Sequence, residues 1–265
     1  MALMDLEIAS KENSHFQELK KISLGENNDY LFIEGKKLFL EAINSPFEIK
    51  KIFINKKNKD FISKLFPGRN NFEVIFIKDE LLASVFTTGS KPTTSDLVVA
   101  LAKKTNWQLS DLFNSQKELI FLERIQDPGN LGAIIRSAFA FDLGGIILTK
   151  GSVNPYNTKV IRASAGAVFK LPIIFVEGFK VVEKAAREKN YKVTATSTNS
   201  NKGLNSLNLN EKRIFLFGNE GRGLSKELLN MADEVITIPH SKSVESLNLG
   251  IAVSIILWER YKNKN

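Results

Sequence analysis

The hydrophobic positions of residues 30–102 form short apolar runs separated by amphipathic segments. Strand-like and helix-like segments follow one another, which predicts a small α/β domain of about 100 residues. The expected strands are 30–33, 49–54, 72–77 and 96–101, and the expected helices are 36–43, 60–66 and 79–86, preceded by a short helix with Phe16, Leu19 and Ile22 on one side.

The same alternation begins again near Glu118, with more continuous apolar runs. Near-continuous apolar strands separated by helices indicate a parallel sheet covered on both faces. The polar stretch around the isolated Trp107 is interpreted as a linker, so we predict domains of residues 1–105 and 118–265 joined by residues 106–117. The expected strands are 119–123, 146–149, 173–176, 192–196, 214–217 and 235–238, and the expected helices are 130–141, 156–167, 179–189, 225–231 and 246–261.

The last expected helix, Ser246 to Tyr261, is apolar almost all round. A helix of this kind should be buried on more than one side. A homodimer interface would cover the second side, and we favour it over burial within one chain.

Composition excludes several classes of site. The chain of 265 residues has 43% hydrophobic and 25% charged residues, which is typical of a globular protein. It contains no cysteine and only two histidines, His15 and His240. Disulfides, thiolate metal sites, cysteine catalysis and multi-histidine metal sites are therefore excluded, and we expect no metal.

Targeting signals are also missing from the sequence. No apolar run reaches the roughly 18 residues that a membrane span needs. The first residues, Met1 to Glu7, carry acids where a secretory signal has basic residues. We expect a cytoplasmic protein without a membrane partner.

The net charge of +8 permits a nucleic-acid partner, because lysines gain free energy by displacing counterions from phosphates. A lysine-rich proteome would give the same composition. The positions of the basic residues along the sequence favour a phosphate-contacting surface in the first domain. One segment is rich in them: Lys50, Lys51, Lys56, Lys57, Lys59, Lys64 and Arg69.

The first stretch with candidate chemistry is Asp127 to Arg136, directly after an apolar strand. Pro128 and Gly129 suit the centre of a type II turn, and Asn130 could then cap the next helix. Arg136 lies one turn beyond Gly132, at the carboxyl end of a strand, where open α/β sheets bind ligands. Taken alone, this stretch favours the simpler interpretation, a surface arginine on a helix that begins with a well-formed turn.

The second stretch, Gly218 to Ser225, joins a strand to a helix that Ser225 can cap. Its glycines have the order G-x-x-G-x-G, whereas a dinucleotide fingerprint needs G-x-G-x-x-G. It is not a Walker loop either, because Leu224 occupies the position of the phosphate-binding lysine. This disfavours a nucleotide-hydrolysing enzyme. A ligand-approach loop and a tight structural turn both remain open.

The third stretch runs from Ile236 to Leu249. It places Ser246 and Asn248 in the first turn of the apolar last helix, where free backbone N–H groups could meet a ligand. Capping of the helix is the simpler interpretation. His240 has no neighbour that would orient it as a base.

Together, the three stretches resemble the three motifs of the SpoU (TrmH-like) RNA ribose 2′-O-methyltransferases of the SPOUT superfamily. The resemblance covers residues from about 118 to 261, and residues 30–102 look like the ribosomal-protein-like RNA-binding domain often attached to these enzymes. It implies a C-terminal parallel-sheet methyltransferase domain tied in a trefoil knot, a homodimer through that domain, and S-adenosylmethionine as cofactor. By motif, the cofactor contacts carried over are Gly218, Ile238 and Leu247, with Thr196 as a further candidate.

The implied reaction is attack of an RNA ribose 2′-hydroxyl on the methyl group of the sulfonium, and the family gives Arg136 the central role. A guanidinium stays protonated in proteins and is a poor base. We therefore expect Arg136 to grip the phosphate beside the target ribose and to stabilise the developing alkoxide. Asn130, Glu220, Ser246 and Asn248 would position Arg136 and the substrate, with Glu220 pairing with Arg136.

The sequence departs from the family pattern at His240, Lys242 and Gly250, and at Ser95–Asp96 in the first domain. These departures bear on the subfamily and on loop shape. The attached domain favours ribosomal RNA as substrate, while transfer RNA stays possible. A catalytically silent RNA-binding relative is the alternative of a different class, and the joint presence of the five candidate catalytic residues argues against it.

Overall fold

A computed structural model describes residues 7–26, 29–68, 71–87, 91–208 and 211–263 of the chain. The chain divides into two compact units, residues 1–106 and residues 107–265. Arg69 and most of the acidic N-terminal segment used above, residues 1–6, lie outside the described residues.

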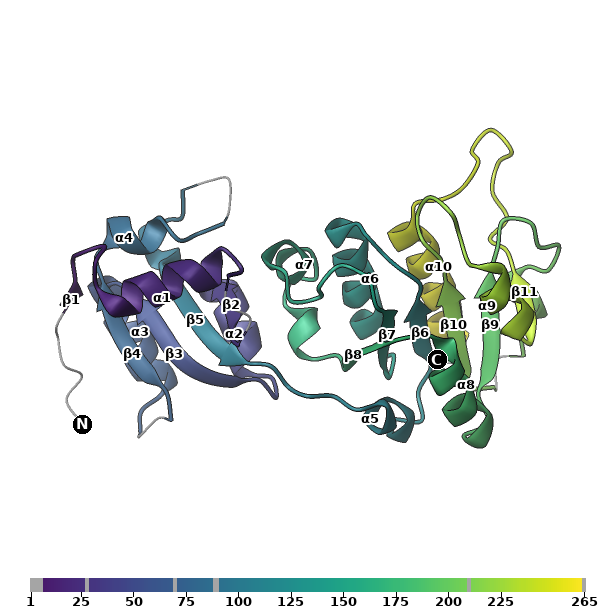
Figure 1. The fold of residues 1–265 in the computed structure, drawn as a ribbon, viewed down its shortest axis with the longest axis horizontal. Helices are drawn as coiled ribbons and strands as arrows, with labels where there is room; N and C mark the ends of the chain where they lie inside the picture. The colour runs from purple at the N-terminus through teal and green to yellow at the C-terminus, as the bar shows by residue number, and fades with distance from the viewer. Residues whose placement is uncertain (1–6, 27–28, 69–70, 88–90, 209–210, 264–265) are drawn as a thin grey trace. The chain divides into compact units, whose positions relative to one another are not determined.

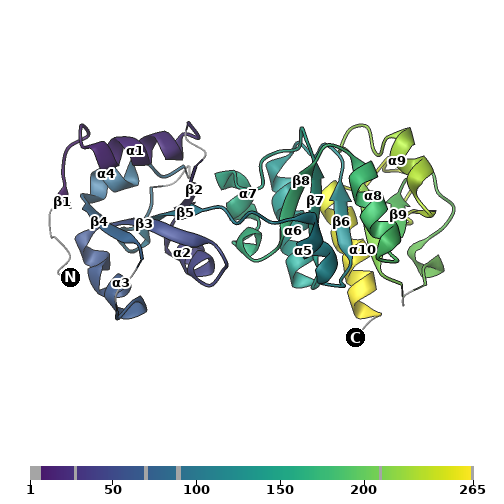
Figure 2. The same ribbon diagram turned by 60° about the horizontal axis from the view of Figure 1, so that its bottom comes forward.

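The first unit is a sheet in the order β1-β4-β3-β5-β2 with helices on both faces (Figure 1). Figure 2 shows α1 and α4 on one side of this sheet and α2 and α3 on the other. The strands are β1 (Glu7–Ile8), β2 (Leu31–Glu34), β3 (Glu48–Ile54), β4 (Glu73–Ile77) and β5 (Val98–Lys103), and the helices are α1 (Ser14–Ser23), α2 (Lys36–Ile43), α3 (Lys59–Leu65) and α4 (Asp79–Ala83).

Three lysines of the lysine-rich segment of the first unit form ion pairs with carboxylates. Lys50 pairs with Glu48, Lys51 with Glu18 and Lys56 with Glu7. Ion pairs that are at least partly exposed to solvent, as these are, contribute little to stability, so the lysines can exchange partners at little cost. The phosphate-contacting surface expected in this segment stays a prediction.

The second unit confirms the predicted α/β fold with a parallel sheet, in the order β11-β9-β10-β6-β7-β8. Its strands are β6 (Leu119–Leu122), β7 (Gly145–Thr149), β8 (Ile173–Val176), β9 (Lys192–Thr196), β10 (Arg213–Phe217) and β11 (Glu234–Ile236), and its helices are α5 (Leu109–Asn114), α6 (Pro128–Ala140), α7 (Thr158–Ala163), α8 (Phe179–Glu188), α9 (Lys226–Met231) and α10 (Leu249–Lys262).

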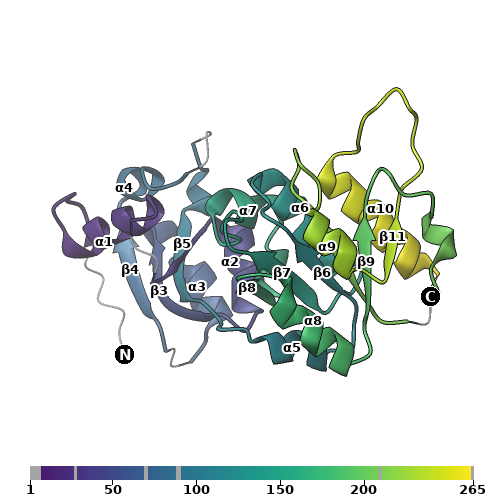
Figure 3. The ribbon, with the colours of Figure 1, turned by 45° about the vertical axis from the view of Figure 1, so that its right-hand side comes forward.

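Two groups of helices cover the two faces of this sheet. Alternate strand residues such as Phe121 and Leu216 pack with α5, α8 and α9 in one buried cluster. Helix α6 packs against α7 and α10 instead, on the side that lies behind the sheet in Figure 3. The connection after β6 therefore leads to one face of the sheet, and the connection after β10 leads to the other.

The predicted linker differs from the structure. Residues 109–114 form helix α5, whose Leu112 and Phe113 are buried in the core of the second unit. A capping box between Gln108 and Asp111 starts this helix. Its few apolar residues stand among many polar ones, so hydrophobic periodicity did not reveal it.

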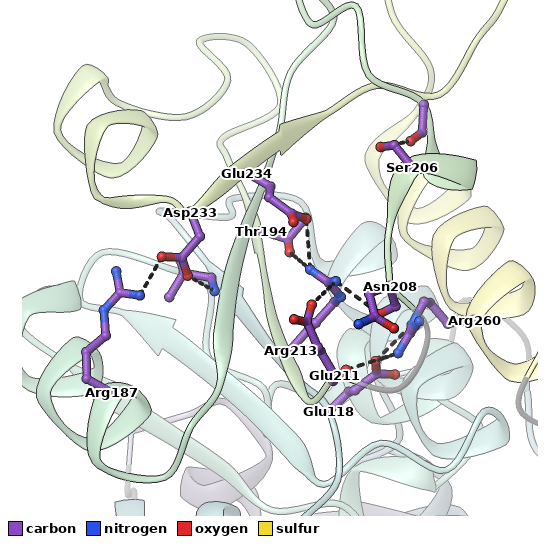
Figure 4. A network of polar contacts seen from close by, with 12 residues as sticks. Glu118, Arg187, Thr194, Ser206, Asn208, Glu211, Arg213, Asp233, Glu234 and Arg260 are labelled. Carbon is purple, nitrogen blue, oxygen red and sulfur yellow. Dashed lines mark hydrogen bonds and ion pairs between the residues drawn. The ribbon is translucent and has the colours of Figure 1, made fainter.

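A buried polar network fixes the C-terminal helix to the start of the sheet (Figure 4). Arg260 of α10 is 2% exposed, and its Nε donates to Glu118, directly before β6, at 2.8 Å. Nearby, the fully buried Arg213 donates to Glu211 at 2.6 Å and to Glu234 at 2.9 Å. These two guanidinium groups tie β6, β10, β11 and α10 together.

Among the described residues, no helix combines the length and the apolar character needed to cross a membrane.

Replacement of Arg260 by alanine should lower the free energy of unfolding by about 3–5 kcal/mol, because it leaves the Glu118 carboxylate buried without its charge partner. Urea unfolding measures this change. The matched control is Arg187→Ala, which breaks the more exposed pair with Asp233 and should cost at most about 1 kcal/mol. Equal losses for the two variants would contradict the role given to Arg260.

Asp233 should make stability depend on pH. Burial raises the pKa of its carboxyl group, but the hydrogen bond from the Val193 N–H and the contact with Arg187 outweigh burial and hold the pKa below its ordinary value. A lowered folded-state pKa stabilises the fold above the unfolded-state pKa of about 3.9, and this contribution is lost as the pH falls through the folded-state value.

Asp233→Asn should therefore be less stable than the unaltered chain at neutral pH, and the difference should shrink below about pH 4. Denaturant unfolding across pH measures the difference. Asp142→Asn, at an exposed carboxylate, is the control and should show little difference at any pH. A deficit of Asp233→Asn that persists unchanged in acid would contradict this account.

Candidate functional site

The site is built around the first turn of α6. Asp127 is the N-cap, and its side chain accepts the Asn130 N–H at 2.7 Å, while Pro128 takes the first helical position. Gly129 is helical and does not have a positive φ. The predicted type II turn and the predicted cap by Asn130 are therefore wrong, because Asp127 caps the helix first.

The side chain of Asn130 is consequently available to join the three sequence stretches. Its Nδ2 donates to Glu220 Oε1 at 3.3 Å, and its Oδ1 accepts from Asn248 Nδ2 at 2.9 Å. These partners lie 90 and 118 residues away in the sequence. Asn248 is itself the N-cap of α10 and accepts the Ile251 N–H at 3.2 Å.

Glu220 fastens the loop after β10 onto the start of α6. Its carboxylate accepts the backbone N–H groups of Gln126 at 3.4 Å and Asp127 at 3.2 Å. A carboxylate at a helix N-terminus is favoured by the partial positive charge of the unpaired N–H groups there. The carboxylate thus accepts from two backbone N–H groups and from the side-chain amides of Asn130 and Asn219, and these four donors fix its orientation.

Arg136 does not join this network within the chain. It is exposed on α6, nearly two turns beyond Asn130, and the described residues give it no hydrogen bond or ion pair. The Glu220–Arg136 pair expected from the sequence is therefore absent within one chain, because Glu220 faces the first turn of the helix. Gly132, one turn before Arg136, is closed off by Ala163: an added Cβ would lie 2.3 Å from the Ala163 Cβ.

The loop after β10 is a tight turn that folds back on itself. A Cβ on the buried Gly218 would lie 2.0 Å from the carbonyl carbon of Gly223, and Gly223 has φ +67°. Asn219 and Gly223 exchange backbone hydrogen bonds of 3.2 and 2.9 Å across the turn. The prediction that Ser225 caps α9 is confirmed, since its side chain accepts the Leu228 N–H.

The residues expected to touch a cofactor lie around this turn and the segment before α10. Gly218 is buried, and its backbone N–H has no hydrogen-bond partner among the described residues; the same holds for the N–H of the half-buried Leu247. Buried N–H groups without partners are rare and call for an explanation. The hydroxyl of Thr196 is engaged, donating to the Leu216 carbonyl at 3.0 Å.

The segment between β11 and α10, the long loop near the top of Figure 1, carries the rest of the third stretch. Helix α10 begins at Leu249, later than predicted, and Ser246 is exposed and makes no hydrogen bond to the Asn130 network. His240 Nδ1 lies 2.7 Å from the Ile238 carbonyl oxygen. Lys242 is exposed.

A cavity of about 560 Å³ opens beside the network, between the loop after β6 and the loop after β10. Arg124 and Arg222 contribute to its lining and were not singled out from the sequence. The position of Arg124, directly at the carboxyl end of an apolar strand, is the signal that could have identified it. In the part of the chain that the structure describes, no group of three or more His, Cys, Asp or Glu could hold a metal ion.

Comparison with known proteins shows which family the chain resembles. The model of the SpoU rRNA Methylase family matches residues 117–258. An uncharacterized tRNA/rRNA methyltransferase of Synechocystis is 34% identical over 69% of the chain and 65% of its own length. The 23S rRNA (guanosine(2553)-2′-O)-methyltransferase RlmP of Bacillus subtilis is 26% identical over 95% of the chain and 98% of its own length.

Among solved structures, an AdoMet-bound rRNA methyltransferase from Sinorhizobium meliloti aligns with a TM-score of 0.84 at 24% identity. The alignment covers 97% of this chain and 98% of that chain. At this identity the likeness shows the fold.

Substitution of Gly218 by alanine should disturb the turn, because the added Cβ would overlap the backbone of Gly223 and Leu224. The free energy of unfolding should fall by about 1–3 kcal/mol, as for other overpacked sites. Gly221→Ala is the matched control in the same loop, since its Cβ would lie 3.6 Å from the Asn219 Oδ1. Denaturant unfolding compares the two, and equal stability would show that the turn is not packed as described.

Proposed function

Because the chain belongs to the SpoU rRNA Methylase family, we propose that it transfers a methyl group from S-adenosylmethionine to a ribose 2′-hydroxyl of RNA, with ribosomal RNA as the substrate. The observation that carries this proposal is the pair of hydrogen bonds in which Asn130 donates to Glu220 and accepts from Asn248. They bring the three motifs of the sequence together at one place in the second unit. The RlmP relative, whose name states ribosomal RNA 2′-O-methylation, spans nearly the whole chain.

S-adenosylmethionine is the methyl donor of the family and supplies an electrophilic methyl group on a sulfonium. The chain fits a cofactor held by backbone groups, since the N–H groups of Gly218 and Leu247 have no partner among the described residues. Gly218, Ile238 and Leu247 would hold it. Thr196 would contribute through contact rather than through its hydroxyl, which is bonded to Leu216.

Arg136 is the residue we assign to the RNA. Its guanidinium is permanently charged and has no anionic partner among the described residues, so it is free to bind a phosphate. From there it stabilises the negative charge that develops on the 2′-oxygen. Asn130, Glu220 and Asn248 orient the ribose. Ser246, in the exposed loop before α10, contacts the substrate when the RNA binds.

A homodimer would complete the site. One face of α10 is exposed although it is apolar: Ile251 is 55% exposed and Trp258 51%. Monomeric proteins rarely leave such patches uncovered. A second copy packed on this face would bring Arg136 of one subunit towards the cofactor residues of the other.

Two further parts of the proposal follow from the family resemblance. The segment from β11 to α10 would be threaded as a trefoil knot, and residues 1–105 would form the domain that binds the RNA substrate. Residues 106–117 were expected to connect this domain to the methyltransferase domain of residues 118–265, although α5 now assigns most of them to the latter.

The function is tested by incubating the protein with radiolabelled S-adenosylmethionine and total RNA from cells that lack it. We expect label in ribosomal RNA, as a 2′-O-methyl group at a mapped nucleotide. Arg136→Ala should lower the rate by about 10²–10³-fold, as for loss of other groups that stabilise developing charge, with unchanged cofactor affinity. Label in transfer RNA would show that the substrate is transfer RNA and not ribosomal RNA. Cofactor binding without methyl transfer to any RNA would contradict the assignment of methyltransferase activity.

Glu220→Gln should impair methyl transfer more than cofactor binding. The N–H groups of Gln126 and Asp127 now donate to different oxygens of the carboxylate, so the NH2 group of glutamine would face one of them with a second donor. The start of α6 should then shift, and Asn130 with it. Transfer rate and cofactor affinity are measured side by side, and an equal loss of both would count against a positioning role.

A further inference from the structure

The cavity beside the Asn130 network lies at a characteristic place in the sheet. It is bounded by the ends of the neighbouring strands β6 and β10, whose connections lead to helices on opposite faces. Such a divergence opens a crevice at the carboxyl ends of the strands, where α/β sheets bind ligands. None of the residues assigned to the cofactor lines this cavity, so a ligand bound in it would be different from the cofactor.

Arg124 is held in the cavity wall by an unusual backbone. Its φ is +53°, which is uncommon for a residue with a side chain. The conformation is fixed from both sides: the Arg124 N–H donates to Thr149 Oγ1 at 2.8 Å, and its carbonyl accepts from Asn219 Nδ2 at 2.8 Å. This backbone aims the side chain across Gly151, where an added Cβ would lie 3.9 Å from Nε.

Arg222 reaches the same cavity from the turn after β10. Neither Arg124 nor Arg222 forms a side-chain hydrogen bond or an ion pair among the described residues, and both are exposed. Glu123, the acidic residue of the lining, is already engaged, because its Oε2 accepts the Ser225 N–H at 2.8 Å. The cavity thus offers two guanidinium groups to an anion.

The cavity is continuous with the candidate methyl-transfer site. Gln126 and Asn219 both line it, and both also hydrogen-bond to the Glu220 carboxylate. Its volume of about 560 Å³ lies within the roughly 300–1,000 Å³ of small-molecule sites, which is enough for one nucleotide.

We propose that this cavity is a subsite for the RNA nucleotide next to the target ribose, with its phosphate bound by Arg124 and Arg222. The inference rests on the proposed function. Arginine suits the role because its planar fork matches phosphate oxygens and its flat face can stack on a base. Sequence-specific RNA proteins commonly splay single-stranded nucleotides into such pockets.

Two substitutions remove the arginines with little damage to the fold. Arg124→Gly is preferable to alanine, since glycine adopts positive φ without strain. Arg222→Ala removes an exposed side chain, and Arg222→Lys keeps its charge. Lys189→Ala, an exposed cation at the far end of α8, is the matched control for the loss of one positive charge.

RNA affinity is measured by filter binding of total RNA across salt concentrations, independently of methyl transfer. Each arginine removed should weaken binding about tenfold and reduce the slope of log K against log salt by about 0.7. In transfer assays, KM for RNA should rise while kcat and S-adenosylmethionine affinity stay unchanged. Arg222→Lys should recover much of the loss, and Lys189→Ala should match the unaltered protein.

The outcomes separate this inference from the proposed function. Normal methyl transfer with unchanged RNA affinity, KM and salt slope in Arg124→Gly and Arg222→Ala would overturn the subsite alone. No RNA binding and no transfer by the unaltered protein would overturn both. A mixture of nucleoside monophosphates that displaces RNA at low concentration would show a free-nucleotide site and would also overturn the proposal.

Discussion

The candidate site depends on the orientation of one amide side chain. Asn130 can donate to Glu220 and accept from Asn248 only because Asp127 supplies the cap of α6 and leaves the Asn130 side chain unused by its own helix. Each group is fixed in turn: Glu220 by backbone N–H groups, and Asn248 by its role as cap of α10. Hydrogen bonds of these side chains with one another and with backbone N–H groups therefore hold three distant segments in register.

The regular elements were largely predictable from hydrophobic periodicity. Helix α2 and strands β8 and β9 have the predicted bounds, because their apolar positions repeat at the helix or strand period. Elements that rely on few apolar residues were missed. Strand β1 has two residues, and α5 begins with a Gln108–Asp111 box rather than with a common capping sequence.

The side-chain pairing in the site could not be predicted in the same way. Asp127 and Asn130 can each cap a helix, and sequence alone does not say which side chain the first turn uses. Arg136 was expected to meet Glu220, yet the loop after β10 approaches the first turn of α6 and not the face of Arg136. The positive φ of Arg124 could not be predicted either, because arginine is not a residue type that indicates this conformation, although its position at the carboxyl end of an apolar strand could have marked it as a candidate.

A double-mutant cycle on kcat, with Asn130→Ala, Asn248→Ala and the double variant, measures whether Asn130 and Asn248 act as one unit in methyl transfer. We expect the double variant to be about as slow as the slower single variant, because either substitution already breaks the same hydrogen bond. Effects of the two substitutions that multiply independently would contradict it.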